Sequence, residues 1–154
     1  YLSAVLDVYK KQIINYRRIT MEIPKVTPFL MFNNQAEEAV NLYTSLFKNS
    51  EILTMVKYGE DGPGEPGTVQ HSIFTLNGQV FMAIDADNGE ELPMNPSISL
   101  YVTVEDVMEM ERLFNGLKKE GAILMPKTPM PPFREFAWVQ DKFGVSFQLA
   151  LPEK

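Results

Sequence analysis

The sequence contains no cysteine and a single histidine, His71. Without cysteine the chain cannot form a disulfide, a thiolate nucleophile, or a cysteine-ligated zinc or iron–sulfur centre. With one histidine it cannot place two imidazoles on one metal ion. The absence of cysteine is typical of proteins that work in a reducing compartment, so we expect a cytoplasmic protein.

Long apolar runs and an excess of positive charge are also missing. No segment reaches the roughly 18 consecutive apolar residues of a transmembrane helix, so no membrane span is predicted. The formal net charge of −6 gives no electrostatic basis for binding nucleic acid. No glycine-rich turn leads from a predicted strand into a helix, which disfavours a nucleotide-type cofactor. No serine lies in a nucleophile elbow.

The 154 residues, 45% of them hydrophobic, suit a single compact domain. We expect residues 21–154 to form this domain and residues 1–20 to be an extension ahead of it. Apolar residues such as Leu2, Val5 and Leu6 recur there at helical spacing, which favours an amphipathic helix. Asp7 interrupts the apolar stretch and basic residues follow it, so the segment does not resemble a signal peptide.

The predicted elements repeat one order, strand–helix–strand–strand–strand. In the first copy they are the strand 26–32, the helix 33–47, and the strands 51–58, 68–76 and 79–86; in the second they are the strand 97–104, the helix 105–121, and the strands 122–127, 134–140 and 145–151. A shift of 71 places Leu46 on Leu117, and a shift of 66 places Phe81 on Phe147. The chain is therefore predicted to be an internal duplication with modules 24–87 and 97–152. The expected fold is α+β, with tandem βαβββ modules forming a curved mixed sheet and helices on its outer face.

Strand alternation predicts which residues lie on the face away from the helices. Asn77-Gly78 is a strong two-residue hairpin signal that pairs Leu76 with Gln79, and a loop at 142–144 would pair Trp138 with Gln148. The candidate ligand-binding residues collected on this face are His71, Met82, Ser99, Tyr101, Trp138 and Gln148. Aromatic, aliphatic and a few polar groups together are typical of a small-molecule pocket. The same mixture also fits a core with satisfied polar groups.

Three segments, PFLMFNNQAEEAVNLYTSLF, HSIFTLNGQVFMAIDA and WVQDKFGVSFQL, resemble the PhnB-like branch of the vicinal oxygen chelate superfamily. This superfamily includes glyoxalase I, bleomycin-resistance proteins and extradiol dioxygenases, and the branch is often labelled a 3-demethylubiquinone-9 3-methyltransferase domain. The resemblance covers about residues 24–152. It implies a glyoxalase/bleomycin resistance-like fold and a homodimer in which the subunits complete a cleft.

In the metal-using relatives, the ligands come from the first and last strands of each module. The resemblance places these slots at about Pro28, Met82, Ser99 and Gln148. A proline side chain has no donor atom, and a thioether, a neutral hydroxyl and an amide are weak ligands for hard divalent ions. We therefore expect no cofactor and no metal site, with a divalent cation held by atypical ligands as the alternative.

The leading functional prediction is a small-molecule-binding protein of the vicinal oxygen chelate type that lacks the usual metal ligands. One alternative is a lyase- or isomerase-type enzyme that uses His71, the candidate catalytic residue, or an atypical metal site. Another is a dimeric interaction module whose cleft is filled by side chains. Asp85 and Asp87, which resemble a metal pair, are interpreted as turn-forming residues.

Overall fold

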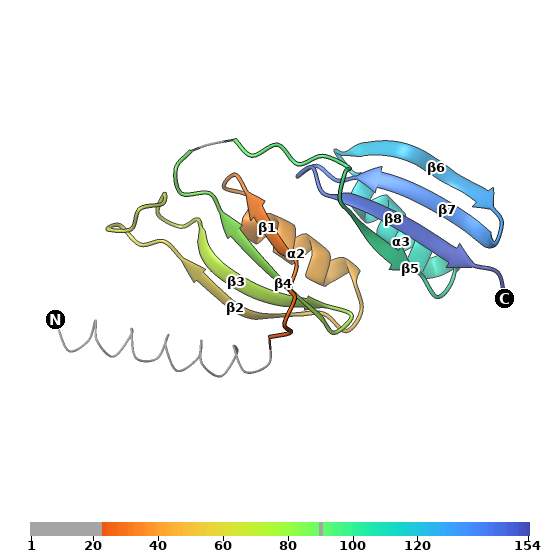
Figure 1. The fold of residues 1–154 in the computed structure, drawn as a ribbon, viewed down its shortest axis with the longest axis horizontal. Helices are drawn as coiled ribbons and strands as arrows, with labels where there is room; N and C mark the ends of the chain where they lie inside the picture. Colours follow the sequence, from red (N-terminus) through yellow and green to blue (C-terminus); the bar gives the residue numbers. More distant parts are fainter. Residues whose placement is uncertain (1–22, 90) are drawn as a thin grey trace.

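The computed structural model describes residues 23–89 and 91–154. The predicted extension, residues 1–20, lies outside the described residues. The first module contains β1 (Phe29–Phe32), α2 (Ala36–Leu46), β2 (Glu51–Lys57), β3 (Val69–Leu76) and β4 (Gln79–Asp85), and the second contains β5 (Ser99–Thr103), α3 (Val107–Lys118), β6 (Ala122–Met130), β7 (Phe133–Gln140) and β8 (Ser146–Pro152) (Figure 1). The predicted α+β class and the tandem βαβββ order are confirmed. None of the helices in the described part of the chain has the length and apolarity to span a membrane.

Each module has its own four-stranded mixed sheet. The strand orders are β1-β4-β3-β2 and β5-β8-β7-β6. In both sheets the first strand pairs in parallel with the last strand of its module, and the other pairs are antiparallel. The same topology in the two halves is what an internal duplication predicts.

The strand registers follow the predicted hairpins. Leu76 pairs with Gln79, and both Asn77 and Gly78 have positive φ, as a type I′ turn requires. In the second module, Gly144 has a φ of 93° and Trp138 pairs with Gln148, as predicted. These registers decide which face of the sheet each side chain occupies.

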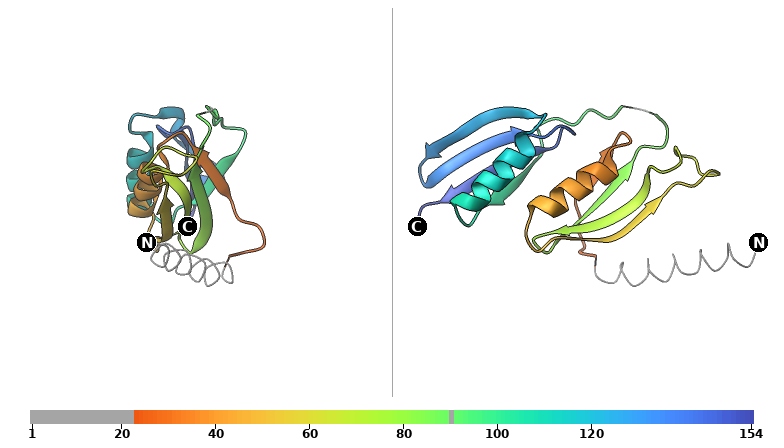
Figure 2. Two further views of the ribbon diagram at one scale, coloured as in Figure 1. Left: turned by 90° about the vertical axis from the view of Figure 1, so that its left-hand side faces the viewer. Right: turned by 180° about the vertical axis from the view of Figure 1, so that it is seen from behind.

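Each helix packs an apolar stripe onto one face of its sheet. In α3 the stripe is Met110, Leu113, Phe114 and Leu117, all buried, and Asp106 caps the helix by accepting a hydrogen bond from the Glu109 amide at 2.8 Å. The rear view in Figure 2 brings both helices to the front. The opposite faces of both sheets, called the open faces below, therefore lie on the same side of the molecule.

The first helix is capped in a way that corrects the interpretation of Asp85. The N-cap position of α2 is Gln35, whose side chain makes no capping hydrogen bond. Instead the buried Asp85 accepts the Ala36 amide at 2.9 Å and the Val69 amide at 2.8 Å. Asp85 is therefore a structural acceptor at the helix N-terminus rather than a turn-forming residue.

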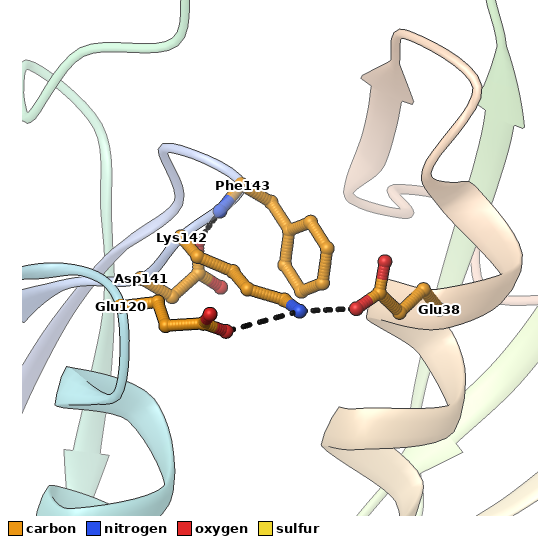
Figure 3. Close-up of polar contacts among 5 residues, drawn as sticks. All are labelled: Glu38, Glu120, Asp141, Lys142 and Phe143. Atoms are coloured by element: carbon orange, nitrogen blue, oxygen red, sulfur yellow. Dashed lines mark hydrogen bonds and ion pairs between the residues drawn. The ribbon is translucent and has the colours of Figure 1, made fainter.

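The two modules share one core, in which α2 packs on the β7–β8 loop. Tyr43 of α2 lies with its ring centroid 5.5 Å from that of Phe147 and 6.4 Å from that of Phe143. The Tyr43 hydroxyl donates to the buried carboxylate of Asp141, which also accepts the amides of Phe143 and Val145 at 2.9 Å. At the surface above this contact, Lys142 lies between Glu38 of α2 and Glu120 just beyond α3 (Figure 3).

Candidate functional site

Four of the six predicted site residues lie together on the open face of the second sheet. In the strand register, Tyr101 of β5 pairs with Gln148 of β8, and Gln148 pairs with Trp138 of β7. Ser99 lies two residues before Tyr101 on the same face and pairs with Ser146. The alternation of the strands thus assembles a row of neutral hydrogen-bonding and aromatic groups.

Ser146 joins this group, although the sequence analysis did not select it as a site residue. The Trp138 indole Nε1 donates to Ser146 Oγ at 2.7 Å, and Ser146 Oγ lies 2.6 Å from Ser99 Oγ. Ser146 is 1% exposed, whereas Ser99 and Trp138 are half-buried. Its position two residues before Gln148, on the same strand face, was the signal available in the sequence.

Gln148 and Tyr101 present polar groups outward from this row. The Gln148 amide is half-buried, the Tyr101 side chain is 53% exposed, and neither side chain makes a hydrogen bond within the described part of the chain. Both groups are therefore available to a bound molecule. An amide and a phenol can each donate and accept.

His71 and Met82 lie on the open face of the first sheet instead. The register pairs Ile73 with Met82 and Ser72 with Ala83, which places His71 one pleat along the same face. Both side chains are half-buried. Burial lowers the pKa of His71 below its ordinary value, so the imidazole is neutral at pH 7. The structure therefore divides the six predicted residues into a group of two and a group of four, on different sheets.

Two grooves lie between the modules, where β5 borders the first module. One, of about 470 Å³, lies against the end of α2 and the β3–β4 hairpin, and its lining includes Ser99, Tyr101, Phe81 and Phe147. The other, of about 420 Å³, lies between β1 and the segment 92–98 and is mostly apolar. Ser99 and Tyr101 thus belong both to the open face and to the border of a groove.

The strand register shows which residues pair at the ligand slots that the resemblance predicts. The register pairs Met82 with Phe29, so the first-strand slot falls one residue beyond Pro28. It also pairs Gln148 with Tyr101, and it pairs the predicted slot Ser99 with Ser146. A phenyl ring has no donor atom, and a thioether, a phenol and an amide are weak ligands for hard cations. In the ranges 23–89 and 91–154, no three His, Asp or Glu side chains are grouped so that they can hold a metal ion.

Comparisons with known proteins place this geometry in a family. The family model described as 3-demethylubiquinone-9 3-methyltransferase matches residues 24–150. The solved structure of the PhnB protein from Bacillus cereus is 51% identical, with a TM-score of 0.80, over 83% of this chain and 99% of that chain. A search of the curated proteins finds no match.

More distant solved structures have the same fold. Protein PA1353 from Pseudomonas aeruginosa is 26% identical, with a TM-score of 0.71, over 86% of this chain and 100% of that chain. The fosfomycin resistance protein FosX from Listeria monocytogenes is 12% identical, with a TM-score of 0.56, over 85% of this chain and 94% of that chain. At 12% identity, the likeness to FosX shows the fold alone.

Proposed function

The chain belongs to the family described as 3-demethylubiquinone-9 3-methyltransferase, in the PhnB-like branch of the vicinal oxygen chelate superfamily, and from this membership and the site we propose that it binds a small organic molecule without a metal. The molecule has an aromatic or apolar body and lies against the open faces. The observation that carries this proposal is the row of Ser99, Tyr101, Trp138 and Gln148 on one face of the second sheet. A flat indole beside accessible neutral hydrogen-bonding groups suits such a ligand.

The choice of a metal-free site rests on the chemistry of the side chains. A catalytic zinc or iron ion typically needs about three strong protein ligands. At the predicted slots and their register partners this chain offers Phe29, Met82, Ser99, Tyr101 and Gln148. None of these is an imidazole or a carboxylate, so no step of the proposed function passes through a metal.

Methyl transfer, which the family description names, does not fit the helix N-termini. A nucleoside-type methyl donor is commonly held at a glycine-rich turn between a strand and a helix. In this chain Asn33, Asn34 and Gln35 precede α2, and Glu105 and Asp106 precede α3. We therefore assign binding rather than methyl transfer.

The proposed binding unit is a homodimer. The two groups of site residues lie on the open faces of different sheets, and these faces lie on the same side of one molecule. A ligand enclosed between the two groups therefore requires the open face of one copy to meet the open face of a second copy. Large apolar side chains flank these faces with high exposure: Phe29 is 50% exposed and Ile98 is 80% exposed. Exposed apolar surface of this kind favours association with a second copy.

Native mass spectrometry of the purified protein tests this function. We expect a small organic molecule to be bound and to be lost in Gln148→Ala. Gln70→Ala is the matched control, because Gln70 is exposed on β3 in the other sheet. Equilibrium dialysis with zinc, nickel, manganese and iron is expected to show no stoichiometric tight binding. One ion held tightly per subunit through Gln148 would overturn the proposal.

A further inference from the structure

Trp138, Ser146 and Ser99 form a chain of hydrogen bonds whose direction is decided by burial. An indole N–H can only donate, so Trp138 donates to Ser146 Oγ. The proton of Ser146 then has one acceptor among the described residues, Ser99 Oγ at 2.6 Å. If Ser99 were the donor instead, the proton of the buried Ser146 would be left unpaired, at a cost of about 1–3 kcal/mol. The chain therefore runs from Trp138 through Ser146 to Ser99.

This direction leaves the proton of Ser99 available to a ligand. Ser99 is half-buried on the open face, and within the described part of the chain its hydroxyl has no partner other than Ser146. Hydrogen bonds aligned in one direction polarise one another, which makes the last hydroxyl a stronger donor. A ligand that covers Ser99 without an acceptor atom leaves this donor unpaired.

The residues beside Ser99 in the row on the open face favour a neutral acceptor. Its neighbours in the row, Tyr101, Trp138 and Gln148, are a phenol, an indole and an amide, and none of them is a carboxylate, an ammonium or a guanidinium group. A carboxylate or an ammonium group buried against them would lose its hydration without gaining an opposite charge. A carbonyl oxygen accepts a hydrogen bond without that desolvation penalty.

We infer that the ligand is a neutral carbonyl compound with an aromatic or apolar body, and that Ser99 is the donor that selects it. Ser146 acts as a positioning residue, because it holds Ser99 through one bond and Trp138 through another. This inference rests on the proposed function, since it concerns a ligand on the same open face. It goes further by naming the chemical group that the site recognises.

Two probes of nearly equal shape test the inference: acetophenone, and α-methylstyrene, in which the carbonyl is replaced by a C=CH₂ group. The chain has one tryptophan, so the indole N–H resonance of ¹⁵N-labelled protein reports on Trp138 alone. We expect acetophenone to shift this resonance with a Kd about five- to tenfold lower than that of α-methylstyrene, the effect of one net hydrogen bond.

Variants then assign the preference to Ser99. Ser99→Ala is expected to weaken acetophenone binding to the level of α-methylstyrene, and Ser99→Thr, which keeps the hydroxyl, to restore the preference. Ser146→Ala is expected to move the indole resonance before any probe is added and to reduce the preference. Ser45→Ala is the matched control, because this exposed hydroxyl on α2 donates to its own helix and faces away from the site.

The possible outcomes distinguish a failure of the carbonyl inference from a failure of the proposed binding function. Equal Kd values for the two probes, or a preference that persists in Ser99→Ala, would refute the carbonyl inference and leave the proposed binding function intact. An unmoved indole resonance in Ser146→Ala would refute the hydrogen-bond chain. If neither probe shifts the resonance up to its solubility limit, both the inference and the proposed binding face are wrong.

Discussion

Replacing Tyr43 with phenylalanine tests the contact that joins the two modules. Tyr43 is fully buried, and its ring packs on Phe143 and Phe147 of the second module. Tyr43→Phe keeps these ring contacts and removes only the hydroxyl that donates to Asp141. Because one oxygen of a buried carboxylate then loses its side-chain donor, we expect the free energy of unfolding to fall by about 1–3 kcal/mol. Asp141→Ala leaves three donors unpaired and is expected to lower it by more than about 3 kcal/mol.

The pH dependence of this loss follows from the pKa of Asp141. Burial raises this pKa above its ordinary value, and the hydrogen bonds from Tyr43 and the backbone amides partly offset the effect. A raised folded-state pKa means that the protonated carboxyl is favoured on folding. The contribution of the protonated Asp141 carboxyl to stability is therefore present below the unfolded-state pKa and is lost as the pH rises through the folded-state pKa. Removing the Tyr43 hydroxyl raises the folded-state pKa further, so Tyr43→Phe should be most damaging at neutral pH and less so in acid.

Urea unfolding, followed by the fluorescence of Trp138 from neutral pH down into acid, measures both effects. Tyr58→Phe is the matched control, because the Tyr58 hydroxyl makes no hydrogen bond to the rest of the described chain. A Tyr43→Phe protein as stable as the wild type at every pH would refute the reasoning. A loss that grows as the pH falls would refute the assignment of the ionised carboxylate as the acceptor.

Three further predictions concern other parts of the fold. Gly121→Ala should lower the melting temperature, because a Cβ there would lie 2.3 Å from the Gln140 carbonyl oxygen, whereas Gly59→Ala, with no atom within 4 Å, should not. An NMR titration should give His71 a pKa below its ordinary value. The contribution of the neutral imidazole to stability is then complete above the unfolded-state pKa of histidine and is lost as the pH falls through the folded-state pKa. An ordinary or raised pKa would contradict the burial of this imidazole. Lys142→Ala should leave the unfolding midpoint nearly unchanged, because its ion pairs lie at the surface, and a large shift would show that they hold the modules together.

The features that the sequence predicts correctly depend on neighbours along the chain. The Asn77-Gly78 turn and the left-handed Gly144 fix two hairpin registers, and the registers fix the face on which Trp138 and Gln148 lie. The duplication is visible because the same local patterns recur in both halves. Local chemistry of this kind can be read from a single sequence.

The features that the sequence does not predict depend on partners far along the chain. Asp85 is interpreted as a turn residue because its neighbours favour a turn, yet one of its partners is the Ala36 amide, 49 residues away. Ser146 is an ordinary serine until the fold places Trp138 and Ser99 on either side of it. The division of the predicted site between two sheets arises because the strands of each module pair only with one another, and strand alternation contains no information about which strands pair.

The two halves of the duplication have diverged into different contributions to the proposed site. The hydroxyl, phenol, indole and amide groups lie in the second sheet, whereas the first sheet offers the thioether of Met82 together with the imidazole of His71. A thioether adds apolar contact but discriminates little between a carbonyl and a methylene group. Met82→Ala should therefore weaken acetophenone and α-methylstyrene by the same factor, because both lose the same apolar contact, whereas Ser99→Ala should weaken the ketone alone. Parallel titrations of the two variants measure this difference. If Met82→Ala changed the ratio of the two Kd values, or left both unchanged, Met82 would not be an apolar contact of the ligand.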